Sequence, residues 1–195
     1  MTTRESIVNL ADRLIRQKGY NAFSFYDISE SIGIKTASIH YHFPTKCDLG
    51  VAVVREQIHA LEQLKKKTSG KDPLQQLKAF LSVYEKIRSE DAVCLVGSLA
   101  TDLNTVDGKV KAELQRFAVL FLDWLTEILR NGKAKQVFTF SVPPRTKAVM
   151  IITNMLAIVQ LSRLTGDADF KLVKKEVVRD LTAKKHSSKT KNRRS

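Results

Sequence analysis

Apolar residues recur every three or four positions along most of this chain, a spacing that predicts helices throughout. The first such run covers about residues 3–18, and Gly19 follows it. Because glycine readily adopts the conformations that end helices, we expect the first helix to stop there. One face of this helix is apolar, with Ile7, Leu10, Ala11, Leu14 and Ile15. That face would pack behind the helices that follow.

Residues 23–48 predict two short helices around a tight turn. Ser24 and Asp27 have the spacing at which a hydroxyl and a carboxylate cap a helix start. Ile28 and Ile32 then give one apolar stripe at helical spacing. Gly33 follows this stripe, at the position where a residue in the left-handed conformation commonly ends a helix. The first of the two helices therefore ends at this glycine.

The second helix is expected over about residues 35–41, with Ile39 and Phe43 facing inward. Its outward face is small, polar and aromatic, and consists of Lys35, Thr36, Ala37, Ser38, His40 and Tyr41. Such a face, with no acidic residue, can enter a major groove and donate to base edges and phosphates. The segment is typical of a helix-turn-helix.

Residues 33–46, Gly-Ile-Lys-Thr-Ala-Ser-Ile-His-Tyr-His-Phe-Pro-Thr-Lys, resemble the signature of the TetR family of bacterial transcriptional regulators. In that signature a glycine and an aliphatic residue precede a few small or polar residues. An aliphatic residue, two aromatic-or-histidine positions, a His and a Phe follow, and a Lys stands at the next helix start. Residues 94–100, Cys-Leu-Val-Gly-Ser-Leu-Ala, are similar to a motif of one branch of the family's regulatory domains. Elsewhere the resemblance is one of length and helical layout.

The resemblance implies an all-α fold. It places a three-helix helix-turn-helix DNA-binding domain at residues 1–48 and a larger helical effector-binding and dimerisation domain at residues 49–183. Residues 184–195 form a basic tail without an apolar side chain, which composition predicts to be disordered.

Roles in DNA binding are carried over from the family position by position. The positions that meet base edges correspond to Thr36, Ala37, Ser38 and His40, with Lys35 and Tyr26 as additions. The phosphate-contacting or orienting positions correspond to Ser24, Tyr41, His42 and Lys46. Hydroxyl, imidazole and ammonium groups are natural phosphate donors. Two alternatives stay open: His42 could cap or pack internally, and Ala37 could be small for clearance rather than for a thymine methyl.

Beyond this segment, helices are expected over about residues 45–65, 74–89, 95–103, 108–130 and 145–164, before a final helix that carries Phe170 to Leu181. The dipeptide at 131–132, Asn-Gly, is expected to end the helix before it. The helix over 145–164 is apolar nearly all the way round, so it needs a partner on more than one side. In TetR-like proteins the last two long helices of each subunit form a four-helix bundle, which implies a homodimer here.

The composition favours a non-enzymatic cytoplasmic protein without a cofactor. The four histidines lack the i, i+4 spacing of helical metal chelation, and neither a zinc-type cysteine pair nor a phosphate-binding glycine cluster occurs. Two cysteines fit a reducing cytosol. The first 15 residues lack a secretory pattern, and the longest uncharged stretch, residues 148–162, is shorter than the ~20 residues that span a membrane.

Charge adds little to the case for specific DNA recognition. The chain has 195 residues and a formal net charge of +13. Residues 1–50 carry six Lys or Arg against five Asp or Glu, whereas residues 184–195 carry six Lys or Arg and no acid. The basicity therefore comes substantially from the tail, and nonspecific binding through the tail is one alternative function.

An effector site is expected in the larger domain. The candidate lining is aromatic and apolar, which favours an apolar small molecule: Phe80, Tyr84, Cys94, Phe117, Phe121 and Trp124. Ordinary core packing is the competing interpretation. Cys94 is either a small buried hydrophobe or, as in some TetR-like repressors, a sensor of electrophiles. Cys47, in the first turn of a helix beside Lys46, should favour thiolate there.

The sequence thus predicts a cytoplasmic, homodimeric, ligand-responsive repressor. Its two reading helices would enter successive major grooves of a pseudo-palindromic operator, about 34 to 36 Å apart on double-stranded DNA. The leading alternative is a helical protein-interaction module that retains the fold without specific DNA recognition.

Overall fold

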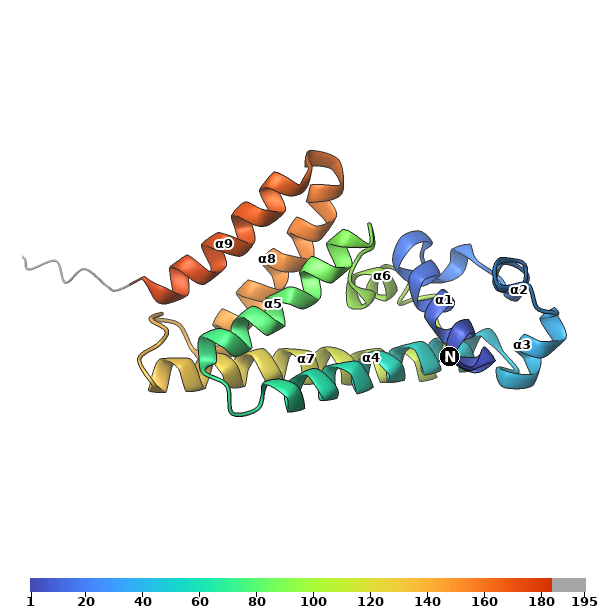
Figure 1. Ribbon diagram of the computed structural model, residues 1–195, viewed down its shortest axis with the longest axis horizontal. Coiled ribbons are helices and arrows are strands. Elements are labelled where there is room, and N and C mark those ends of the chain that lie inside the picture. Colours follow the sequence, from blue (N-terminus) through green and yellow to red (C-terminus); the bar gives the residue numbers. More distant parts are fainter. Residues whose placement is uncertain (184–195) are drawn as a thin grey trace, which may run out of the picture.

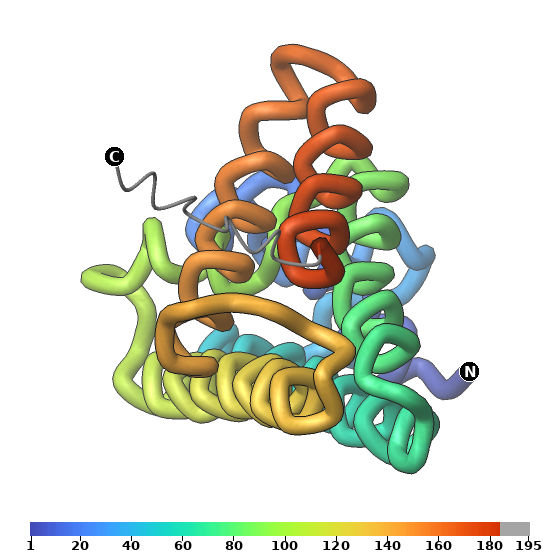
Figure 2. Tube along the Cα trace, turned by 90° about the vertical axis from the view of Figure 1, so that its left-hand side faces the viewer, coloured from blue at the N-terminus to red at the C-terminus, as the bar shows by residue number. Residues whose placement is uncertain are grey.

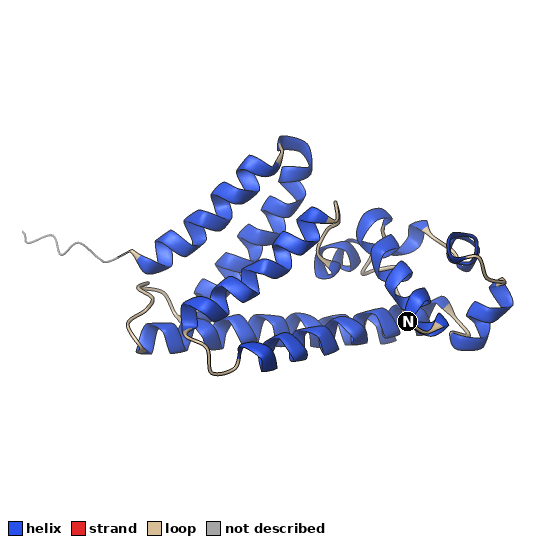
Figure 3. Cartoon of the chain, in the orientation of Figure 1, coloured by secondary structure: helices blue, strands red, loops and turns tan. Residues whose placement is uncertain are grey.

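The structure, a computed structural model, describes residues 1–183, and within that range the chain is helical without a strand (Figure 3). The predicted all-α class is therefore confirmed. The elements in order are α1 (Thr3–Lys18), the short 3₁₀ helix η1 (Tyr20–Ala22), α2 (Phe25–Ile32), α3 (Thr36–His42), α4 (Lys46–Thr68), α5 (Pro73–Ser89), α6 (Leu95–Thr101), α7 (Gly108–Ala134), α8 (Pro144–Thr165) and α9 (Asp167–Thr182). The predicted tail, residues 184–195, lies outside the described residues.

Helices α1 to α3 form one end of the molecule, here called the head (Figure 1). Helix α4 leads out of the head and packs lengthwise against α7. Helices α5 to α9 form the rest, here called the body, in which α8 packs against α7 and α9. An end view shows α8 and α9 side by side at one face of the body (Figure 2).

The helix-turn-helix is delimited by the local signals that the sequence contains. The Ser24 and Asp27 pair forms a capping box at α2, with Ser24 N donating to Asp27 Oδ2 over 2.6 Å. The Thr45 and Asp48 pair does the same at α4. Gly33 ends α2 at φ 70°, in the left-handed region that glycine enters without strain. The predicted cap at Ser24 and the predicted helix end at Gly33 are confirmed.

Helix α7 departs from the prediction, because it runs through residues 131–132 to Ala134. A Cβ on Gly132 would lie 2.0 Å from Phe138 Cδ2, so the glycine serves close packing of the Phe138 ring. The same glycine's carbonyl accepts from Val137 N and Phe138 N, at 2.8 and 3.1 Å. The expectation that this dipeptide ends the helix was therefore wrong. The other predicted helix ends lie within three residues of the observed ones.

The C-terminal half of α1 is hydrogen-bonded to the body. Ser98 Oγ, on α6, donates to Ile15 O over 2.6 Å and is itself buried. Val93 N, just before α6, donates to Arg16 O over 3.1 Å. The last turn of α1 therefore cannot shift along α6 without breaking these two bonds.

Candidate functional site

Helix α3 packs against α1 and α2, the other helices of the head, through its apolar side. Ile39 is fully buried and Phe43 is 3% exposed. Thr36 Oγ1 donates to Ser29 Oγ of α2 over 3.2 Å, so the two helices of the motif are also tied by their hydroxyls. These contacts fix which side of α3 faces outward.

The outward side of α3 is the one the sequence predicted. Lys35, Ala37, His40 and Tyr41 are exposed, and Thr36, Ser38 and His42 are half-buried. Tyr41 is 84% exposed, and Tyr26, on α2, is 66% exposed. Helix α3 contains no Asp or Glu. Of the predicted base-contacting residues, Thr36 and Ser38 are thus the less accessible ones, and the DNA contacts of the whole set stay a prediction.

Two of the predicted phosphate-contacting groups, Ser24 and Lys46, make side-chain hydrogen bonds within the protein. The Ser24 hydroxyl donates to Asp27 Oδ2 over 2.6 Å. His42 is half-buried and its ring lies 5.2 Å from that of Tyr41, with an edge-on geometry.

Lys46 faces inward. Its Nζ donates to Phe23 O and lies 4.9 Å from the Tyr20 ring centre and 4.2 Å from the Phe23 ring centre. Burial lowers the pKa of the Lys46 ammonium below its ordinary value. The side chain thus ties the start of α4 to the segment before α2. Of its two predicted roles, phosphate contact or orientation, this geometry supports orientation.

The aromatic set predicted to line an effector site forms a packed cluster in the body. Phe80 contacts three of the other rings, with centroids 4.5 Å from Phe121, 5.4 Å from Trp124 and 6.0 Å from Tyr84. All five aromatic side chains are at least 93% buried. Phe80 and Trp124 lie within the core and line neither of the two cavities beside this cluster. Tyr84, Phe117 and Phe121 do line them.

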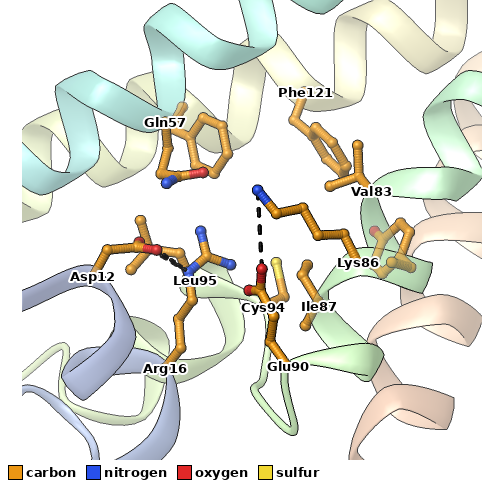
Figure 4. A pocket seen from close by; sticks show the side chains of 12 residues that line it. Asp12, Arg16, Gln57, Val83, Lys86, Ile87, Glu90, Cys94, Leu95 and Phe121 are labelled. Carbon is orange, nitrogen blue, oxygen red and sulfur yellow. Dashed lines mark hydrogen bonds and ion pairs between the residues drawn. The ribbon is translucent and has the colours of Figure 1, made fainter. Parts of the chain in front are cut away.

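Two cavities share Tyr84, Cys94 and Phe121 in their walls. The apolar cavity, about 180 Å³, lies among α5, α6, α7 and α8. Its other lining residues are Val96, Ala118, Leu122, Val149, Ile152, Thr153 and Leu156. The polar cavity, about 90 Å³, lies where α1 and α4 meet α5, α6 and α7 (Figure 4). Its polar lining consists of Asp12, Arg16, Gln57, Lys86 and Glu90.

Sequence reasoning missed the polar lining. Four of its residues come from α1, α4 and α5, and Glu90 directly follows α5. They are separated by up to 78 positions, from Asp12 to Glu90. Each alone has the character of a surface residue. Only the packing of α1 against α4 and α6, and of α4 against α5, brings them together.

Neither cysteine is in an environment that favours the thiolate. Burial raises the pKa of the Cys94 thiol, which agrees with the core interpretation. Burial, followed by a hydrogen bond with Asp107, also raises the pKa of the Cys47 thiol. The expectation that the start of α4 would promote the Cys47 thiolate was therefore wrong, because burial and the carboxylates of Asp107 and Asp48 raise the pKa of this thiol.

A second surface of interest is an open groove of about 610 Å³ between α8 and α9. Its walls include Met150, Leu161 and Leu172, which are 47%, 51% and 56% exposed.

By length and composition α8 could also cross a membrane, a test that core helices of soluble proteins pass as well. In residues 1–183, no cluster of three His, Cys, Asp or Glu side chains could hold a metal ion.

Residues 7–53 match the family described as bacterial regulatory proteins, tetR family, and residues 73–171 match the tetracyclin repressor-like C-terminal domain. No functionally curated protein is significantly similar to the chain.

Solved structures with the same fold are similar over nearly the whole chain. A TetR transcriptional regulator from Legionella pneumophila is 30% identical, with a TM-score of 0.82, over 93% of this chain and 98% of that one. One from Agrobacterium tumefaciens is 29% identical, with a TM-score of 0.82, over 92% and 97%. The reduced form of Escherichia coli NemR, 17% identical over 92% and 97% with a TM-score of 0.76, shares the fold. The chain therefore belongs to the TetR family of DNA-binding transcriptional regulators, whose members are generally not enzymes.

Proposed function

We propose that the protein is a cytoplasmic, homodimeric repressor that binds a pseudo-palindromic operator and leaves it when a small molecule occupies the body. The observation that carries this proposal is the outward face of α3. It is exposed, contains no acidic residue, and is held in one orientation by Ile39 and Phe43. A rigidly seated helix of this kind can place several side chains against base edges at once.

Residues in the middle of the outward face of α3 would make the direct contacts with base edges. Thr36, Ala37, Ser38 and His40 would read bases, and Lys35 and Tyr26 lie beside them. Tyr41, one of the phosphate candidates, is 84% exposed and can donate its hydroxyl outward. Phosphate contacts would fix the register of α3, and base contacts would select the sequence.

The groove between α8 and α9 supports the homodimer. A monomer would leave the apolar side chains of Met150, Leu161 and Leu172 in water, which is unfavourable for a contiguous patch. The α8–α9 pair of a second subunit would bury them in a symmetric contact. The resulting dimer would present two copies of α3, as a pseudo-palindrome requires.

The apolar cavity supports control by a small molecule. Its walls are almost entirely aliphatic and aromatic, and α8 forms one of them, so an apolar ligand there would contact both a core helix and a dimer helix. To shift the ratio of the DNA-binding state to the released state from 99:1 to 1:99, the ligand must prefer the released state by about 5.5 kcal/mol.

Selection of genomic fragments by the full-length protein at moderate salt tests the proposed function. We expect enrichment of one inverted repeat with half-sites about one helical turn apart, resistant to excess bulk DNA. A helical interaction module would enrich no duplex. A nonspecific binder acting through residues 184–195 would also show no preference, and would lose its affinity when those residues are deleted.

The inward position of Lys46 leads to a further expected result. Lys46→Met should weaken binding to all duplexes by disturbing the head, yet leave the salt dependence of binding unchanged. Lys35→Met is the contrast, because Lys35 is exposed, and it should reduce the slope of log K against log salt by about 0.9. Salt titrations followed by fluorescence anisotropy measure both slopes. A slope reduced by about 0.9 in Lys46→Met would show instead that Lys46 turns outward to a phosphate.

A further inference from the structure

The polar cavity contains a buried arginine whose donors are only partly used. Arg16 is 7% exposed, and its Nε donates to both carboxylate oxygens of Asp12, at 2.8 and 2.9 Å. Within residues 1–183, neither terminal nitrogen of this guanidinium makes a hydrogen bond. Figure 4 shows them pointing into the space between Gln57 and Cys94.

Two further polar groups of this cavity are unpaired. The Tyr84 hydroxyl is buried and has no hydrogen-bond partner in the part of the chain that the structure describes. The Gln57 side chain, half-buried in the opposite wall, makes no hydrogen bond within residues 1–183. Of these groups only the Tyr84 hydroxyl is closed off from solvent, so the Gln57 amide and the terminal nitrogens of Arg16 are open to a ligand that enters the cavity.

We propose that the polar cavity binds the carboxylate of a small organic anion through the terminal nitrogens of Arg16. This inference rests on the proposed function, because it names the chemical class of an effector. The two terminal nitrogens form a planar edge that matches the two oxygens of a carboxylate, a pairing that neutral acceptors cannot reproduce.

The acidic side chains around the cavity do not prevent an anion from binding to Arg16. Asp12 is already engaged through both oxygens, so it does not compete for the terminal nitrogens. At the mouth, Lys86 Nζ lies 3.9 Å from Glu90 Oε1, and both side chains are more than half exposed. So long a contact in solvent is weak, and Lys86 can turn from Glu90 to an incoming carboxylate.

The remaining walls select a short apolar group behind the carboxylate. Val83, Leu95, Phe117 and Phe121 surround the cavity, and its 90 Å³ suits a chain of a few carbons. Since Tyr84, Cys94 and Phe121 separate this space from the apolar cavity, their displacement would admit a longer or aromatic group.

A ligand in this position would bridge head and body. Arg16 belongs to α1 and Gln57 to α4, whereas the other walls belong to α5, α6 and α7. The same turn of α1 accepts the hydrogen bonds from Ser98 and Val93. Occupancy would therefore act where the orientation of α1 on the body is fixed.

Calorimetric titration of the full-length protein with butyrate and its isosteric amide, butyramide, tests the inference. A second pair, benzoate and benzamide, tests the larger class. We expect the wild-type protein to bind one of the anions about tenfold or more tightly than the matching amide, because a bidentate pair with arginine is charge-assisted. Equal binding of anion and amide, or no binding of either pair, would overturn the proposal.

Substitution locates the site. Arg16→Met should lower anion affinity about tenfold or more and leave the affinity for the amide nearly unchanged. Arg13→Met is the matched control, because Arg13 lies exposed on the same helix, and should change neither. If Asp12, left without its partner, prevents folding, the double variant Asp12→Asn, Arg16→Met removes both charges. Full anion affinity in a folded Arg16 variant would refute the assignment.

The readout does not depend on DNA. Anion binding that requires Arg16, in a protein without operator preference, would support this site while contradicting the proposed function. Operator binding in a protein that binds none of the anions would support the proposed function while contradicting this site.

Discussion

Replacing Ala37 by glutamate is expected to lower operator affinity about 100-fold or more while leaving the protein folded. Ala37 is exposed in the middle of the outward face of α3, where the proposed complex brings base edges and phosphates close. A carboxylate there would face the negative charge of the duplex, and like charges across an interface cost several kcal/mol. A cost of about 2.7 kcal/mol corresponds to a 100-fold loss of affinity. Anisotropy titration with the selected operator measures this loss.

Ala60→Glu is the matched control. It adds the same charge to an exposed alanine of a helix, but on α4, outside the head. The two variants should have similar melting temperatures, because exposed helix substitutions change stability little. Undiminished operator affinity in a folded Ala37→Glu protein would remove α3 from the interface. An equal loss in Ala60→Glu would attribute the effect to net charge.

The head was predictable because its signals are local. Ser24 and Asp27 are three residues apart, and their exchange of hydrogen bonds depends only on the backbone between them. Gly33 likewise needs only its own left-handed φ to end α2. The outward face of α3 then follows from helical periodicity once Ile39 is assigned to the core.

The features that the sequence did not reveal depend on contacts between helices. Gly132 has the sequence context of a helix end, yet it lies inside α7 because the Phe138 ring occupies the space of its missing Cβ. Periodicity indicated that Phe80 and Trp124 are buried, but not that they are packed away from both cavities. Which buried side chain meets a cavity is decided by three-dimensional packing.

Arg16 illustrates the same limit for function. In the sequence Arg16 follows Asp12 by four positions, and ion pairs at this spacing are common on solvated helix faces. Its burial arises from the approach of α5 and α6, which contribute Lys86, Glu90 and Cys94 to the same cavity. The charge pattern of α1 alone therefore could not distinguish a surface ion pair from a ligand-binding group.

The double variant Leu161→Glu, Leu172→Glu is expected to convert the protein into a monomer of 22.0 kDa at micromolar concentration. Both leucines are more than half exposed in the single chain and lie on opposite walls of the α8–α9 groove. The monomer should therefore tolerate glutamate at both positions. In the dimer the carboxylates would be buried without partners, which costs several kcal/mol per ion. Light scattering coupled to size exclusion measures the mass.

Loss of the dimer should also reduce operator affinity, since each subunit would then engage one half-site alone. Linked binding of two half-sites typically contributes a factor of about 10² to 10⁴, so an equivalent loss is expected without any change in the head. The double variant Ala60→Glu, Ser82→Glu adds the same two charges at exposed positions of α4 and α5. It should remain dimeric and keep its operator affinity. A wild-type protein that is itself monomeric at micromolar concentration would reject both the interface and the two-groove geometry that depends on it.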